Sequence, residues 1–126
     1  MALDNAAELA DTWIAHWQDY EATGQFVQNT TGRFTDLPYN DPDTCWRFIR
    51  CVLERIEAKP ENPLFQVLAA GPLEDLLNHW GAEVIDRVEK EALRDPRFRQ
   101  LLGGVWRSTI DNDIWSRVEA CRLGPW

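Results

Sequence analysis

The sequence has little lysine and no long apolar run, and each shortage narrows the functions open to it. Lys59 and Lys90 are the only lysines, and the net charge is −8. Nucleic acids are bound mainly by Lys and Arg, which displace counterions from phosphates, so this balance argues against nucleic-acid binding. No apolar stretch approaches the roughly 20 residues that cross a bilayer, and residues 1–11 lack the pattern of a signal peptide. We therefore expect a cytoplasmic protein that binds neither nucleic acid nor membrane.

Cysteine is too scarce and too irregularly spaced for a disulfide framework or a metal site. The three cysteines are Cys45, Cys51 and Cys121, an odd number without any Cys-x-x-Cys spacing. The first two are six residues apart, which places them on different faces of a helix. We expect buried or half-buried free thiols in a reducing cytoplasm.

Recognisable catalytic and cofactor motifs are also missing. Gly103-Gly104 is not followed by the Lys and Ser or Thr of a phosphate-binding loop, and no G-x-S-x-G run occurs. His16 and His79 are the only histidines, and His16 lies between Trp13 and Trp17 in a pattern typical of packing. The sequence therefore predicts neither a cofactor nor a catalytic site.

The residues that are present favour one α-helical domain over residues 1–126. The chain has 126 residues, 44% of them hydrophobic, with seven tryptophans, enough to bury a core without staples. Apolar spacings of three and four, separated by Pro and Gly, indicate successive helices. We expect them at about 3–22, 41–58, 62–70 and 72–80, over about 83–92, at about 95–106, and from a cap at Asp111 or Asp113 to about 121. Gly71 should end one helix before Pro72 starts the next, and Gly81 should interrupt the helical pattern.

The short connections predict an irregular multi-helix bundle or a small superhelix of about six to seven short helices. The stretch from Gly24 to Asn40 breaks the helical period. Within it, the Asn-Thr-Thr-Gly run at residues 29–32 leaves open a short β-hairpin near residues 26–35. A loop of this length inside a small domain is uncommon and often functional.

Acidic residues are concentrated at the N-terminal end. Residues 1–44 contain eight acids and one base, Arg33. Such a surface either attracts a basic protein partner and speeds the encounter with it, or serves only to keep the protein soluble. A terminal tryptophan, Trp126, is either folded back on the core or exposed as an anchor for a partner. The candidate partner-binding residues are Asp4, Asp11, Asp19, Asp36, Asp41, Asp43 and Trp126.

One polar cluster offers an alternative, enzymatic interpretation. Asp75 and His79 are four residues apart, so on a continuous helix they share a face and could ligate a metal or form an acid/base pair. Glu74 and Glu83 lie close by in the sequence. The structural interpretation is a hydrogen bond on the helix surface, with acids in the first turn complementing the helix dipole.

The C-terminal half resembles a family of small bacterial proteins known only as a domain of unknown function. The run L-A-A-G-P-L-E-D-L-L at residues 68–77 carries the resemblance. Further matching positions are Gly81, residues 95–98, Val105-Trp106 and residues 113–115. The resemblance implies a bacterial cytosolic source and brings no activity with it.

These observations favour a non-catalytic acidic binding protein over an enzyme. The most concrete form of the hypothesis is an immunity or antitoxin-type inhibitor that masks the basic surface of a bacterial toxin. Two alternatives stay open: a metal-dependent or acid/base enzyme centred on Glu74, Asp75, His79 and Glu83, and a homo-oligomeric structural module.

Overall fold

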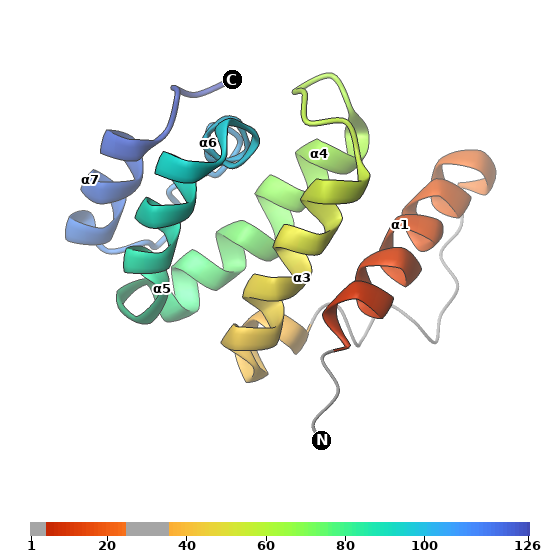
Figure 1. The fold of residues 1–126 in the computed structure, drawn as a ribbon, viewed down its shortest axis with the longest axis horizontal. Helices are drawn as coiled ribbons and strands as arrows, with labels where there is room; N and C mark the ends of the chain where they lie inside the picture. The colour runs from red at the N-terminus through yellow and green to blue at the C-terminus, as the bar shows by residue number, and fades with distance from the viewer. Residues whose placement is uncertain (1–4, 25–35) are drawn as a thin grey trace.

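The computed structural model describes residues 5–24 and 36–126, and all regular structure within them is helical (Figure 1). No strand occurs in this part of the chain, which confirms the all-α class. The hairpin considered near residues 26–35 lies outside it. The elements are α1 (Ala6–Thr23), α3 (Pro42–Arg55), α4 (Pro63–Leu68), the π-helical turn η1 (Ala69–Leu73), α5 (Glu74–Arg94), α6 (Pro96–Leu102) and α7 (Asn112–Cys121).

The predicted helix starts are confirmed at single-residue level where an acid or amide precedes proline. Asp41, Asn62 and Asp95 each accept a hydrogen bond from a backbone N–H in the first turn of the following helix, at 3.0–3.1 Å. Asp111 caps α7 in the same way. These side chains accept hydrogen bonds from N–H groups of the first turn, which have no partner within the helix.

The corner expected at Gly71-Pro72 is absent, because the chain stays helical from α4 through η1 into α5. Proline lacks the N–H that an α-helical turn needs, which should break the helix. Here the turn widens instead: the N–H of Glu74 bonds to the carbonyl of Ala69, five residues back. The π-helical turn thereby accommodates Pro72 inside a continuous helix.

Gly81 likewise does not end a helix, since α5 continues through it to Arg94. The helix kinks one residue earlier, at Trp80, where φ is −123° and ψ is 24°. A Cβ on Gly81 would lie 3.1 Å from Cγ2 of Ile114 on α7. Glycine is therefore present for close helix packing rather than for a helix end.

The helices pack around one continuous hydrophobic core. α1 packs chiefly on α3, and α7 packs chiefly on α5, so these pairs lie at opposite sides in Figure 1. Trp46 joins α3 to α6 through an edge-on contact with Phe98, at 5.4 Å between ring centroids. Within the described residues, no helix combines the length and apolar character needed to cross a bilayer.

The cysteines are buried or half-buried, as the sequence predicts. Cys45 is buried and Cys51 and Cys121 are half-buried, all three as free thiols.

The expected helix at 95–106 is too long, because α6 ends at Leu102 and Trp106 lies in the following loop with 74% of its surface exposed. The glycine pair after Leu102 stops the helix before the tryptophan reaches the core.

Candidate functional site

The acids of the N-terminal third all lie at the surface wherever the structure describes them. We call this set the acidic segment. It comprises Glu8, Asp11, Asp19, Glu21, Asp36, Asp41 and Asp43. Asp4 lies outside the described residues. The acidic segment therefore presents seven carboxyl side chains to solvent.

Arginines from other helices neutralise part of the acidic segment. Arg55 of α3 donates to Asp11 of α1 at 2.8 Å, and Arg87 of α5 donates to Asp43 of α3 at 2.7 Å. Both acids remain well exposed, with 68% and 61% of their side-chain surface accessible. These pairs tie neighbouring helices together, so Asp11 and Asp43 have a structural role that sequence analysis missed.

The remaining acids of the segment differ in their local roles. Asp41 caps α3, and hydrogen bonds from the side chain and backbone N–H of Thr44 hold its pKa below the ordinary value. Asp19 and Asp36 are exposed, and no ion pair to either is found within residues 5–24 and 36–126. Glu8 and Glu21 share these two properties within the same described residues.

Trp126 does not belong to this surface. Its contacts are with α4, α6 and the loop after α6, and the C-terminal end of the chain lies away from α1 in Figure 1. Its ring stacks on Phe65 of α4, and its indole N–H donates to the carbonyl of Gln100 at 2.6 Å. The structure therefore divides the predicted partner-binding residues between two regions.

The structure brings two members of the polar cluster of α5, Asp75 and His79, to the same side chain, Tyr39. Glu74 accepts the backbone N–H of Trp106 at 2.9 Å, and burial raises its pKa. Asp75 accepts a hydrogen bond from the Tyr39 hydroxyl, and burial raises the pKa of this carboxyl as well. His79 packs edge-on against the Tyr39 ring, 5.2 Å between centroids.

Glu83 is separated from the other three members by the kink at Trp80, and its side chain is exposed. Within the described part of the chain, no three or more His, Cys, Asp or Glu side chains are grouped so that they could hold a metal ion. Asp75 and His79 thus gain no third ligand there.

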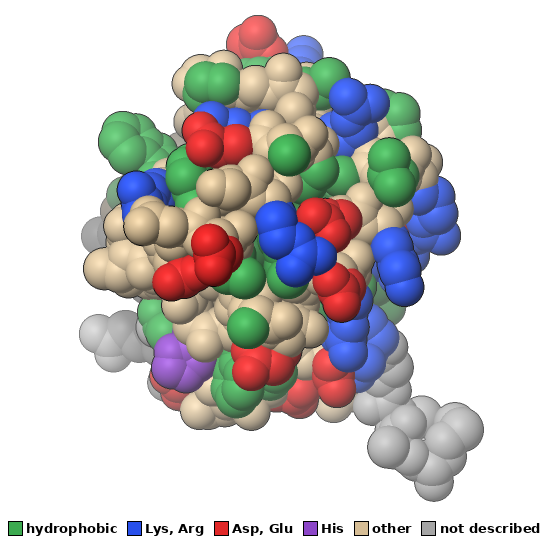
Figure 2. Space-filling view, turned by 90° about the vertical axis from the view of Figure 1, so that its left-hand side faces the viewer, with side chains coloured by type: hydrophobic (Ala, Val, Ile, Leu, Met, Phe, Trp, Pro, Cys, Tyr) green, Lys and Arg blue, Asp and Glu red, His purple; other side chains and the backbone are tan. Residues whose placement is uncertain are grey.

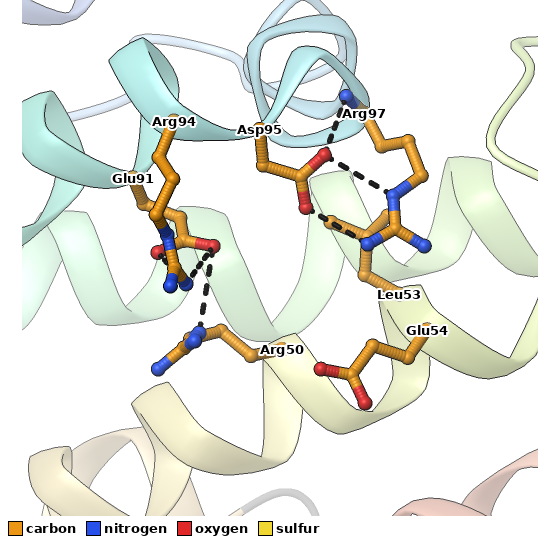
Figure 3. A pocket seen from close by; sticks show the side chains of 7 residues that line it. All are labelled: Arg50, Leu53, Glu54, Glu91, Arg94, Asp95 and Arg97. Carbon is orange, nitrogen blue, oxygen red and sulfur yellow. Dashed lines mark hydrogen bonds and ion pairs between the residues drawn. The ribbon is translucent and has the colours of Figure 1, made fainter.

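A charged cleft lies between α3 and the junction of α5 and α6 (Figure 3). Its cavity volume is about 390 Å³. It is lined by Arg50, Leu53, Glu54, Glu91, Arg94, Asp95 and Arg97. The sequence does not predict this cleft, because its arginines and acids come from segments some 40 residues apart and nothing in the local pattern indicates that they meet.

Glu91 is the centre of the charged cleft. Arg94 donates two hydrogen bonds to it, at 2.8 and 3.0 Å, and Arg50 Nε lies 3.5 Å from Oε2. The Glu91 side chain is only 10% exposed, and the hydrogen bonds from Arg94 replace those to the water it loses. Arg50 Nε forms an ion pair with Glu91 but has no hydrogen-bond partner among the described residues. In Figure 3 both arginines point toward this carboxylate, one from α3 and one from α5.

A second pair completes the charged cleft. Arg97 donates to both carboxylate oxygens of Asp95, at 3.1 and 3.0 Å, and these bonds hold the pKa of Asp95 below its ordinary value. Three arginines therefore face three acids. Of these pairs, Arg50–Glu91 connects α3 to α5, and the lining residues include no Ser, Cys or His.

Comparison with protein families adds one finding. Residues 21–126 match the sequence model of a protein family described as a family of unknown function, DUF6869. The chain belongs to the DUF6869 family. No curated protein and no solved structure shows significant similarity to the chain.

The DUF6869 match covers some candidate regions and leaves out others. The charged cleft, the polar cluster of α5 and Trp126 all lie within residues 21–126. Asp11 and Asp19 on α1 lie outside the matched range. The acidic segment is thus only partly covered, through Glu21, Asp36, Asp41 and Asp43.

Proposed function

We propose that this DUF6869 chain is a non-catalytic binding protein that recognises a basic protein partner through the acidic segment. The observation that carries the proposal is the exposure of all seven described acids of residues 5–44. Arg33, the one base of residues 1–44, lies outside the described residues. Only Asp11 and Asp43 of the segment are paired with arginines from the rest of the described chain.

The distribution of charge elsewhere supports this choice of surface. Figure 2 shows the face of the molecule on the α7 side, where acidic and basic side chains are interspersed. On α5 and α7 the same mixing is seen in Arg117, which is paired with both Asp86 and Glu89. An excess of one sign is therefore a property of the acidic segment, and local excess steers a partner of opposite charge.

A basic partner with a defined site fits better than a polyanion or a membrane. Phosphates and anionic lipids would be repelled by the acidic segment. A toxin with a cationic active site, such as a nuclease, presents the complementary charge. We therefore propose an immunity or antitoxin-type inhibitor of bacterial, cytoplasmic origin as the concrete form of the function, with the run at residues 68–77 as a family signature.

Affinity capture from the native cells tests the proposal. The full chain should retain one basic protein at low salt and release it at high salt, because charge attraction is screened. The double variant Asp19→Asn/Asp36→Asn should retain clearly less. Glu83→Gln/Asp113→Asn changes the net charge equally on α5 and α7 and should retain the wild-type amount. Recovery of the chain alone, or equal retention by both variants, would contradict the proposal.

A further inference from the structure

A second cavity lies beside the loop that follows α6 and is also lined by residues of α4, α7 and the C-terminal segment. Its volume is about 540 Å³, within the range of sites that enclose small organic molecules. Three tryptophans line it, Trp106, Trp115 and Trp126, and we call it the tryptophan pocket. Apart from Gln66, Arg107 and Arg122, the other lining residues are glycine, alanine, valine and proline.

The wall made by Trp126 is held in place by several independent contacts. The ring stacks on Phe65, the indole N–H donates to Gln100, and the backbone N–H donates to the carbonyl of Gly103 at 3.1 Å. A Cβ on Gly103 or Gly104 would overlap the indole. The two glycines thus form the floor on which the tryptophan lies, and the wall exists before any ligand arrives.

The wall made by Trp106 is fixed through its backbone while its ring stays open to solvent. Glu74 accepts the Trp106 N–H, and Asn78 bonds to Thr109 in the same loop. The Trp106 side chain is left 74% exposed. A large apolar ring held in water beside a preformed cavity is typical of a binding site, since folding alone gains little from it.

Charge gives the tryptophan pocket its chemical preference. Arg107 and Arg122 line it and no acid does, in a chain with a net charge of −8. The Arg122 side chain is only 11% exposed and lies over the Trp115 ring, 5.1 Å from its centroid. Its single ion pair within the described residues, to Glu119, is long at 3.5 Å. The guanidinium therefore keeps donors available for another anion.

We propose that the tryptophan pocket binds a small organic anion with a flat apolar body, such as an aromatic carboxylate, sulfonate or phosphate. The tryptophan rings bury the apolar body, and Arg122, assisted by Arg107, holds the anionic group. A small molecule fits better than a nucleic acid, because the acidic segment repels an extended polyanion. This site is separate from the acidic segment, so either proposal can fail without the other.

A matched pair of dyes tests both halves of the proposal. 8-Anilinonaphthalene-1-sulfonate carries a sulfonate, and N-phenyl-1-naphthylamine has the same rings without it. Fluorescence titration of the native full chain should show one saturable site that binds the sulfonate dye at least about tenfold more tightly, the value of one charge-assisted contact. Near-UV circular dichroism checks that each protein used is folded.

Variants assign the two contributions to residues. Arg122→Gln should weaken the sulfonate dye about tenfold and leave the neutral dye unchanged. Trp106→Ala should weaken both dyes. If Arg122→Gln does not fold, Arg107→Gln is a second variant that removes a positive charge from the tryptophan pocket. Arg94→Gln removes an arginine of the charged cleft and serves as the matched control, with unchanged binding of both dyes.

Several results would overturn the proposal. Equal binding of the two dyes would show an apolar patch without anion recognition. Loss of the sulfonate dye in Arg94→Gln would place the anion in the charged cleft instead. Binding that is insensitive to Trp106→Ala and to both arginine variants, or the absence of a saturable site, would remove the pocket from consideration.

Discussion

The indole of Trp126 stacks on the ring of Phe65, with the centroids 5.3 Å apart and the ring planes at 14°. Trp126 is the last residue of the sequence shown, and Phe65 lies on α4. The contact closes the C-terminal segment over the end of α6, where Gly103 and Gly104 leave room for the indole. The contacts that hold the C-terminal segment in place therefore also shape the tryptophan pocket.

Gly104→Ala should destabilise the protein by about 1–3 kcal/mol, the usual cost of inserting a methyl group into a packed site. The added Cβ would overlap the Trp126 indole. Urea unfolding of Gly104→Ala, Trp126→Ala and the double variant measures the coupling between the two residues. The cost of Gly104→Ala should largely vanish in the Trp126→Ala background. An equal cost in both backgrounds would show that the indole does not occupy this place.

The stability of the Glu74→Gln variant, relative to that of the wild type, should increase as the pH rises from acid to neutral. Burial raises the pKa of Glu74 in the folded state. A raised pKa of an acid contributes stability that is complete below the unfolded pKa and is lost as the pH rises through the folded pKa. Glutamine keeps an oxygen for the Trp106 N–H and carries no charge to desolvate.

The measurement is the free energy of unfolding of both proteins across this pH range. Glu74→Ala is the control that removes the acceptor, and it should cost about 1 kcal/mol at acid pH, where the wild-type carboxyl is uncharged. A difference between Glu74→Gln and the wild type that stays constant with pH would contradict the burial of this carboxyl.

Cys45 should be unreactive toward thiol reagents until the protein unfolds. Its side chain is fully buried, and burial, with Asp75 and Asp41 nearby, raises its pKa to about 12. The thiolate is the reactive form, so both access and ionisation protect it. A disulfide reagent at mildly alkaline pH, followed by mass spectrometry, should modify Cys51 in the native protein well before Cys45. Comparable rates for the two would contradict the packing of α3.

Local signals in the sequence predicted the helix starts. The features that the sequence did not predict depend on contacts between residues far apart in the chain, or on a turn type without a sequence signal. Asp41, Asn62 and Asp95 each precede proline, and a cap depends on neighbours in the chain. Gly81 resembles a helix end, but its lack of a side chain serves the contact with Ile114, more than thirty residues away. Pro72 resembles a helix start because a π-helical turn has no sequence signal that distinguishes it.

The candidate sites follow the same division. The exposure of the acidic segment could be predicted from charge, since most carboxylates stay in water, whereas the burial of Glu91 could not. The pairing of Asp11 with Arg55 and of Asp43 with Arg87 depends on how α1, α3 and α5 pack. The charged cleft and the tryptophan pocket also bring together distant segments, so neither could be predicted from spacing along one helix.

If the acidic segment attracts a basic partner, the rate of association with that partner must depend on salt concentration. With the partner recovered by affinity capture, stopped-flow mixing should show a wild-type rate that falls steeply with ionic strength. Asp19→Asn/Asp36→Asn should associate about threefold to tenfold more slowly at low salt, with a flatter salt dependence, while Glu83→Gln/Asp113→Asn matches the wild type. Identical rates and slopes for all three proteins would contradict the account.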